Sequence, residues 1–325
     1  MASAPGKVVL SGEYAVLDGA PAICLAVNRF AQVRMSSVDG DTSSVSAPGY
    51  TDTMGRFRFT GGDLVWLDGQ REFAVLDSIF RSSDVGLSAG FCIILDTTEF
   101  IDPATQQKMG IGSSAALTVA LCAALKNSVD VGALARRAHS RLQGGVGSGV
   151  DVACSLSGGL IEYRVEGAAI ATIDWPSGLR FRLIWTGVAA SSKGKLLRLD
   201  AVISKPSRVR LAIAAETLAK AWRSGDADLI IMQYGDYIEH LREFSVDHDL
   251  GIFDAGHDEL WQAAVAANLV YKPCGAGGGD VGIVFGTDDV ALDAFIAAIA
   301  TKYSLLDCEI SYTGARIEEA RVKEE

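Results

Sequence analysis

The sequence predicts a mixed α+β protein with two segregated halves. Its 325 residues are enough for two domains, or one large domain, with a sizeable core. Segments typical of strands and of helices follow one another without an internal repeat, and long amphipathic helices gather in the second half. We place the division between residues 1–175 and residues 176–325.

The first half begins with "KVVLSGEYAVL", which is typical of a strand, a turn and a second short apolar piece. The stretch Ser36–Asp63 is rich in Ser, Gly, Asp and Thr and predicts hairpins and loops, and "FCIILD" (Phe91–Asp96) predicts a buried strand. We expect a helix from about Ser113 to Lys126 and a second one after Asp130, a good N-cap residue. Another helix of small residues and the strand "LIEYRV" complete this half.

The second half follows "GAAIATIDWPSGLR", which we interpret as the crossing between the halves. It opens with the strand "FRLIWTG" and continues with three helices, expected at about Pro206–Ser224, Ala227–Phe244 and His257–Ala267. The last helix leads into the glycine-rich stretch "YKPCGAGGGDVGIVFG". We interpret the amphipathic pattern of the long helices as core and surface faces.

Composition and charge exclude several classes of partner. A formal net charge of −11, without a basic run, argues against nucleic-acid binding. Six scattered cysteines without a C-x-x-C pair favour reduced core residues over a disulfide framework or a zinc site. The apolar run 115–125 is too short to span a membrane, and Glu13 and Asp18 interrupt the segment where a signal peptide would be apolar. We therefore expect a cytoplasmic monomer or homodimer with no nucleic-acid or membrane partner.

Three glycine-rich loops, at Gly110–Ser114, Gly144–Gly149 and Gly275–Gly279, each border an expected helix or strand. Glycine lets the backbone approach a ligand closely and present successive N–H donors, which suits phosphate. The first loop, in "KMGIGSSAAL", could alternatively be an ordinary helix start with a serine N-cap. It is not a Walker loop, because no G-x-x-x-x-G-K-[ST] occurs, and "GIGSSA" does not follow the strand that a dinucleotide-binding fold requires.

Taken in order, the loops resemble the motifs of the GHMP superfamily of small-molecule kinases, and the resemblance spans nearly the whole chain. "APGKVVLSGEYAVLDG" looks like the first motif, "KMGIGSSAALTVA" like the second and "KPCGAGGGDVGIVF" like the third. The resemblance implies an N-terminal half like domain 2 of ribosomal protein S5 and a ferredoxin-like C-terminal half, with ATP and the acceptor in the cleft between them. Gly110–Ser114 would then be the phosphate loop, and the dipole of the following helix would favour the triphosphate.

Within the superfamily, the sequence is most similar to the phosphomevalonate kinases, in "GEYAVL", "QGGVGSGVDVA", "WTGVAASSKGKLL" and "KPCGAGGGD". A mevalonate kinase would more usually have His at Tyr14 and Asn at Val152. The implied activity is ATP- and Mg²⁺-dependent phosphoryl transfer to 5-phosphomevalonate, giving 5-diphosphomevalonate in isoprenoid synthesis. The alternatives are mevalonate kinase, a kinase of a related hydroxy acid, and a non-catalytic ligand-binding homologue. The last should have lost Lys7, Ser114 or Asp151, and all three are present.

The resemblance also implies roles for three residues. Asp151 would be the catalytic aspartate, Lys7 would lie near the transferred phosphate, and Ser114 would place its hydroxyl on Mg²⁺. The alternatives are, in turn, a carboxylate favoured at a helix N-terminus, an exposed lysine on an edge strand, and a helix N-cap. The helix before Asp151, "RRAHSRLQGG", offers no acid where mevalonate kinases carry a glutamate for Mg²⁺. Ser114 is therefore the metal ligand that we assign.

The remaining assignments surround the two substrates. The phosphate loop would bind ATP through Gly110, Gly112, Ser113, Ser114 and Ala115. The acceptor would lie against Glu13, Tyr14, Gly147, Ser148, Gly149, Ser191, Ser192, Lys193, Lys195, Gly277 and Gly278. Two alternatives stay open. Glu13 and Tyr14 could simply pack a turn, and "SSKGK" could be a solvated turn.

Two further expectations concern side chains outside the motifs. Asp280 would order the third glycine-rich loop. The four histidines share no motif, and we interpret them as surface or packing residues; they are His139, His240, His248 and His257.

Overall fold

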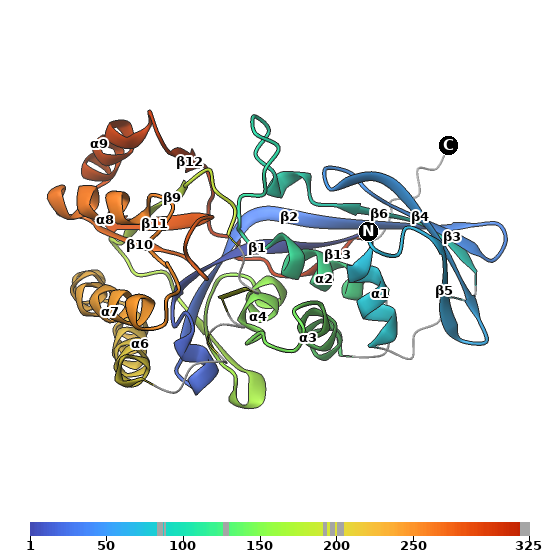
Figure 1. Cartoon of the computed structure of the whole chain (residues 1–325), viewed down its shortest axis with the longest axis horizontal. Helices are drawn as coiled ribbons and strands as arrows, with labels where there is room; N and C mark the ends of the chain where they lie inside the picture. The colour runs from blue at the N-terminus through green and yellow to red at the C-terminus, as the bar shows by residue number, and fades with distance from the viewer. Residues whose placement is uncertain are drawn as a thin grey trace.

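Two β-sheets organise the chain, and helices pack against each of them (Figure 1). The computed structural model describes residues 1–82, 87, 89–125, 130–190, 194–195, 199 and 205–318. Within these residues the mixture of strands and helices falls into two groups, and this confirms the predicted α+β class.

The larger sheet has its main path in the order β13-β1-β2-β6-β3-β4-β5, with β7 paired to β2 and β8 to β7. Its strands are β1 (Ala2–Ser11), β2 (Ala22–Val38), β3 (Thr42–Ala47), β4 (Thr51–Thr60), β5 (Asp63–Asp68), β6 (Gly90–Asp96), β7 (Leu160–Arg164), β8 (Ala169–Ile173) and β13 (Arg316–Ile317). β1 is buried along its whole length. The stretch predicted as hairpins and loops forms the end of β2, then β3 and β4, and reaches the start of β5.

The helices of the first half lie on one side of the larger sheet (Figure 1). They are α1 (Ala74–Arg81), α2 (Ser113–Ala124), α3 (Val131–Leu142) and α4 (Val150–Ser157). α2 consists mainly of small and apolar residues, so it packs closely against β1 and β2 with Ala116 and Ala120 fully buried. α3 begins as predicted, because the Asp130 carboxylate accepts hydrogen bonds from the amides of Gly132 and Ala133.

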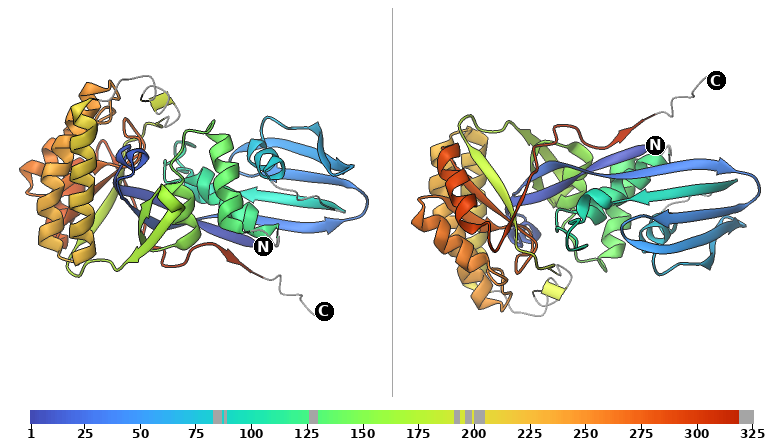
Figure 2. Two further views of the ribbon diagram at one scale, coloured as in Figure 1. Left: turned by 90° about the horizontal axis from the view of Figure 1, so that it is seen from below. Right: turned by 90° about the horizontal axis from the view of Figure 1, so that it is seen from above.

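The smaller sheet is antiparallel, in the order β10-β11-β9-β12. Its strands are β9 (Arg180–Trp185), β10 (Val270–Pro273), β11 (Val281–Gly286) and β12 (Ser304–Leu306), and its helices are α6 (Pro206–Ser224), α7 (Ala227–Asp247), α8 (His257–Ala266) and α9 (Asp289–Ile299). Side chains alternate along β9, so Leu183 belongs to the core under α6 and α7 while Ile184 belongs to the core under α8 and α9. The sheet thus lies between the two helix pairs, and Figure 2 shows α6 and α7 side by side. This arrangement agrees with the expected ferredoxin-like half.

The two halves share a core and exchange chain segments. One cluster of buried apolar side chains includes Leu10 of β1 together with Trp222 and Phe244 of the second half. After β12 the chain returns to the larger sheet, where the Ser311 amide donates to the Ala26 carbonyl (2.9 Å) and β13 pairs with β1. The sequence did not predict this return, and the division between residues 175 and 176 stays a prediction.

The segment predicted as the crossing between the halves contains one more strand of the larger sheet. The short helix η3 (Glu166–Ala168) leads into β8, whose five residues pair with β7. The other short helices are η1 (Ala15–Asp18) and η2 (Thr98–Phe100). Among the described residues, no helix combines the length and the apolar character needed to cross a membrane.

Candidate active site

The phosphate loop requires glycine at two positions. Gly110 and Gly112 have φ angles of +76° and +87°, a left-handed region that favours glycine. A Cβ atom on Gly110 would lie 2.2 Å from Cγ of Asp280, and one on Gly112 would lie 2.9 Å from Cε of Lys7. The loop is therefore enclosed by a residue of the first motif on one side and a residue of the third motif on the other.

The serines of the loop do not cap the helix behind it. Gly112 is the N-cap of α2, and in the described part of the chain no side chain makes the capping hydrogen bond. Ser113 and Ser114 occupy the first turn, where Ser114 is exposed. The first amides of α2 thus stay open to a ligand anion, and the alternative of a serine N-cap is wrong.

Lys7 and Asp151 form a buried ion pair beside this loop. Lys7 Nζ lies 3.3 Å from Oδ1 of Asp151, and Lys7 is 8% exposed, so it is not the exposed edge lysine of the alternative. Burial alone would raise the pKa of Asp151, but its attraction to Lys7 and then to His139 outweighs burial and holds this pKa below its ordinary value. Burial likewise opposes the charge of Lys7, yet the attraction to Asp151 leaves the pKa of Lys7 raised. Both groups are charged at neutral pH.

The second glycine-rich loop and the helix that follows it place Asp151 beside Lys7. Gly149, with φ +84°, is the N-cap of α4, and Asp151 lies in the first turn of that helix. A Cβ atom on Gly147 would lie 1.8 Å from the Gln143 side-chain amide, so the loop packs directly on the end of α3. The Ser148 carbonyl accepts a 2.8 Å hydrogen bond from the Tyr163 hydroxyl, which fixes the loop to β7.

The third glycine-rich loop is held by Lys195. The Lys195 ammonium donates to the carbonyl of Gly277 at 2.7 Å, and to those of Ala276 and Gly251 at 3.3 Å each. A Cβ atom on Gly278 would lie 2.3 Å from Lys195 Nζ. Lys195 thus faces the loop beside the expected acceptor position. The other residues of the "SSKGK" cluster, Ser191, Ser192 and Lys193, lie outside the described residues.

Asp280, which the sequence suggested would order the third loop, also connects that loop to the first. Its carboxylate accepts a 3.0 Å hydrogen bond from the Ala190 amide, and its side chain lies against Gly110. The Asp280 carbonyl accepts a hydrogen bond from the Thr186 amide at 3.0 Å. Burial raises the pKa of Asp280. The two loops therefore form one continuous wall.

His257 also holds the third loop, and the interpretation of this residue as an ordinary histidine missed its contacts. The ring is fully buried, with Nε2 2.8 Å from the Gly279 carbonyl and Nδ1 2.7 Å from the Tyr271 hydroxyl. Burial lowers the pKa of His257 to about 4, so the ring is neutral at neutral pH. We assign the proton to Nε2, because the Gly279 carbonyl can only accept.

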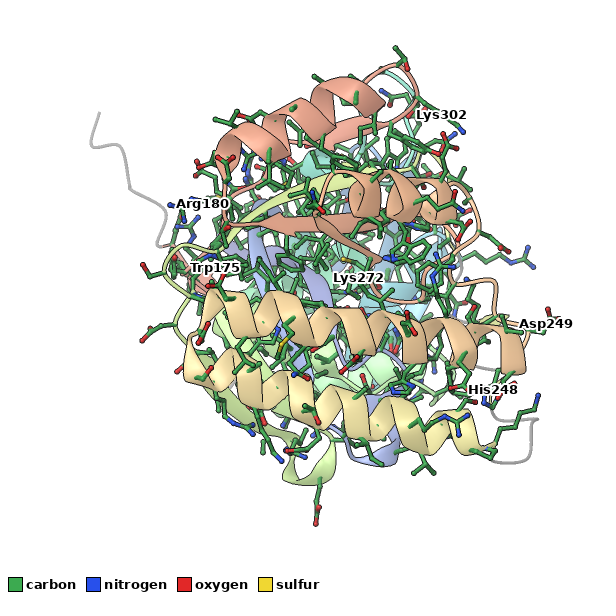
Figure 3. The ribbon with its side chains drawn as sticks, turned by 90° about the vertical axis from the view of Figure 1, so that its left-hand side faces the viewer. Trp175, Arg180, His248, Asp249, Lys272 and Lys302 are labelled. Carbon is green, nitrogen blue, oxygen red and sulfur yellow. The ribbon has the colours of Figure 1, made fainter. Side chains whose placement is uncertain are left out.

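Glu13 and Tyr14 are anchored by residues of the second half. The Glu13 carboxylate pairs with Lys272, which is fully buried (Figure 3), and accepts a 2.6 Å hydrogen bond from the Tyr237 hydroxyl. Tyr14, with φ 60°, donates its hydroxyl to the Ala276 carbonyl at 2.7 Å. Both residues therefore fix the turn after β1 to the second half, and both also line a pocket.

That pocket, of about 110 Å³, lies between the two halves. We call it the Lys7 pocket; the lining residues used below are Lys7, Glu13, Tyr14, His139, Gln143, Gly147, Ser148, Gly149, Asp151 and Ala276. It brings together residues of the first motif, residues of the second glycine-rich loop with Asp151, and the start of the third loop. Gly277, Gly278 and Lys195 are not among its lining residues. His139 and Gln143 were not predicted, although His139 stands on the helix that precedes "GSGVD" and Gln143 is the C-cap of that helix.

A second pocket, of about 160 Å³, lies on the other side of the phosphate loop. We call it the Ser114 pocket; its lining includes Ser113, Ser114, Lys108, Tyr50, Phe73 and Leu117. The Lys108 ammonium stands 4.6 Å from the centre of the Tyr50 ring. Lys7 lines the Lys7 pocket and lies against Gly112 of the phosphate loop, and two serines of the same loop line the Ser114 pocket. The phosphate loop therefore separates two neighbouring pockets.

Comparison with known proteins decides the family. The family profile described as "GHMP kinases N terminal domain" matches residues 81–159. A phosphomevalonate kinase of Streptomyces sp. (strain CL190) is 30% identical over 330 residues, which cover 86% of this chain and 88% of that protein. The chain belongs to the GHMP kinase family. It is therefore a kinase, and the motif resemblance is confirmed.

Other GHMP kinases are similar over comparable lengths. A mevalonate kinase of Bos taurus is 27% identical, covering 95% of this chain and 90% of its own. The structure of Streptococcus pneumoniae phosphomevalonate kinase in complex with phosphomevalonate and AMPPNP superposes with a TM-score of 0.77 at 20% identity, covering 95% of this chain and 99% of that one. At this identity the likeness supports the two-part GHMP kinase fold.

Proposed function

We propose that this GHMP kinase transfers a phosphoryl group from ATP to 5-phosphomevalonate, giving 5-diphosphomevalonate in the mevalonate pathway of isoprenoid synthesis. Similarity to the Streptomyces enzyme over most of both chains supports this acceptor. The observation that carries the proposal is that both carboxylates lining the Lys7 pocket are paired with a lysine, Asp151 with Lys7 and Glu13 with Lys272. A pocket whose acids are neutralised suits an acceptor that is itself strongly anionic.

In this proposal ATP occupies the Ser114 pocket and the phosphate loop. The half-buried side chain of Leu117 and the exposed ring of Tyr50 offer a surface for the nucleoside. The open amides at the start of α2 would receive the phosphates, at the positive end of the helix. Gly110, Gly112 and Ala115 complete this phosphate loop.

The residues present also fit Mg²⁺. Magnesium in phosphoryl-transfer sites takes one or two protein oxygens and completes its shell with phosphates and water. Ser114, exposed in the first turn of α2, and the ionised Asp151 are the donors that would hold it. The ion, when bound, would neutralise charge on the phosphates.

Lys7 has the central catalytic role in this account. It stands between the Lys7 pocket and Gly112 of the phosphate loop, so its ammonium is placed to stabilise charge on the phosphoryl group in transit. Asp151 holds Lys7 and orients the acceptor. A phosphate monoester has a second pKa of about 6 and is mostly dianionic at pH 7, so it needs little help from a general base.

Mevalonate kinase is the second candidate. The bovine relative covers more of this chain than the Streptomyces enzyme does, at a lower identity. A hydroxyl acceptor would need a base, and Asp151 at the pocket wall could accept its proton.

Initial rates of ADP release with phosphomevalonate and mevalonate, side by side, test the proposal. We expect kcat/KM for phosphomevalonate to exceed that for mevalonate by about 10²-fold or more, because a site built for a charged group discriminates strongly against its absence. Preference for mevalonate would overturn the acceptor.

Three accompanying proposals concern the whole protein. We propose that it acts in the cytoplasm, which six free cysteine thiols support. We also propose that it works as a monomer or homodimer on small molecules. The division into residues 1–175, with the phosphate loop, and residues 176–325 stays part of the proposal.

A further inference from the structure

Two side chains at the end of α3 that the mechanism above does not use, one in its last turns and one at its C-cap, form a wall of the Lys7 pocket. His139 and Gln143 are four residues apart, so they lie on the same face of the helix, one turn from each other. Both line the pocket together with Lys7, Asp151 and the glycines of the second loop. The pocket is therefore polar on this side as well.

His139 is a buried polar group that no other part of the described chain satisfies. The residue is 3% exposed, and no hydrogen bond from the described residues reaches its ring. Its ring nitrogens are nevertheless not completely enclosed by protein, and the ring lines the Lys7 pocket. A buried polar group costs free energy unless it is hydrogen-bonded, so this ring requires a partner from the pocket side.

The neighbours of His139 determine which partner fits. Asp151 and Lys7 are its charged neighbours, and they neutralise each other. Burial lowers the pKa of His139, so the ring is neutral and carries one N–H donor. An anion with several acceptor oxygens can receive this N–H without adding a second buried cation to the site.

Gln143 extends the same wall. Its side-chain amide occupies the space that a Cβ atom on Gly147 would need, so Gly147 is the residue that permits Gln143 to lie against the second loop. Both side chains can donate an N–H group, and neither carries charge. The end of α3, from His139 to the C-cap residue Gln143, thus presents two neutral donors beside the buried ion pair.

We propose that His139 and Gln143 bind the phosphate of the acceptor, and that they are specificity residues for a phosphorylated substrate. This inference rests on the proposed function, because it assigns the contacts of the same acceptor. Neither residue belongs to the assigned ATP site, and neither lines the Ser114 pocket. Their loss should therefore weaken acceptor binding and leave ATP binding unchanged.

Equilibrium titration of phosphomevalonate into the wild type, His139→Phe and His139→Gln tests the proposal. Phe fills the space without a donor, and we expect the Kd for phosphomevalonate to rise by about 10-fold or more, the usual effect of losing a hydrogen bond to a charged group. Gln keeps a donor and should recover part of the affinity. The KM for ATP and the melting temperature should stay close to those of the wild type, which a merely structural role would not allow.

The matched control is His240→Phe, since His240 is a partly exposed histidine of α7 far along the chain from both pockets. It should change neither Kd nor rate. A folded His139→Phe that binds phosphomevalonate within twofold of the wild type overturns the proposal. If that variant does not fold, the same titration is made with Gln143→Leu, and a Kd for phosphomevalonate within twofold of the wild type overturns the proposal. A wild type that phosphorylates mevalonate and does not bind phosphomevalonate overturns the proposed function, and this inference with it.

Discussion

Lys7 of β1 lies 3.3 Å from Asp151 of α4, and the two residues form a buried ion pair although 144 positions separate them (151 − 7). The pair stands where the phosphate loop meets the Lys7 pocket. Removing either partner leaves the other charge buried and unpaired. This usually destabilises a protein more than replacing both residues by apolar ones of similar size. The two residues should therefore be tested together.

We expect Lys7→Ala to lower kcat at least as much as Asp151→Asn. Each substitution should lower kcat by about 10²–10³-fold, the usual effect of removing a group that stabilises charge in the transition state. The reason is that an anionic acceptor needs charge neutralisation more than it needs a base. Steady-state rates with saturating ATP measure both variants. If Asp151→Asn abolished turnover while Lys7→Ala hardly affected it, our account of the mechanism would be wrong.

Ser114→Ala should raise the Mg²⁺ concentration required for half-maximal rate. The exposed hydroxyl in the first turn of α2 is the proposed metal ligand, and the fold does not depend on it because it makes no capping bond among the described residues. A Mg²⁺ titration of the initial rate provides the measurement. Ser37→Ala, which changes an exposed serine of β2, is the control. An unchanged Mg²⁺ requirement would remove Ser114 from the metal site.

Lys272→Met should destabilise the protein by about 3–5 kcal/mol, because it leaves the Glu13 carboxylate buried without its cation. The free energy of unfolding in urea gives the comparison. Lys302→Met removes an ion pair with Glu259 that is more than half exposed, and it should have little effect. Equal effects of the two substitutions would show that Lys272 does not hold the halves together.

His257 should make stability depend on pH in acid. Its pKa is about 4 in the folded protein and 6.5 ordinarily. Between these two pH values the residue is protonated in the unfolded chain but not in the folded protein. Stability should fall from about pH 6.5 down to about pH 4, by about 3 kcal/mol from this residue. His257→Gln, which keeps a donor for the Gly279 carbonyl, should show a shallower fall in unfolding free energy over this window. Parallel curves for variant and wild type would contradict the assignment.

Local patterns in the sequence predicted those parts of the site that short segments can specify. The glycines at 110, 112 and 149 adopt positive φ angles at loop turns, and Asp130 caps its helix, because these conformations depend on neighbouring residues. The same local logic placed α6 at its observed bounds.

Contacts between distant segments were not predictable in this way. Glu13 and Lys272 are 259 positions apart, and no local pattern in either segment predicts that the two side chains form an ion pair. His257 looked ordinary because its partner carbonyl, on Gly279, lies 22 residues further on. His139 carried a weak signal, since it precedes "GSGVD" on the helix whose end packs against that loop, but only the fold shows that this face lines the pocket.

Phosphorus NMR of the reaction mixture tests the central claim, a phosphate acceptor, most directly. With wild-type enzyme, ATP and Mg²⁺, we predict that the single resonance of phosphomevalonate is replaced by the two coupled resonances of a diphosphate. A parallel reaction with mevalonate should give no new monoester resonance. A new monoester resonance from mevalonate, with phosphomevalonate left intact, would contradict the account.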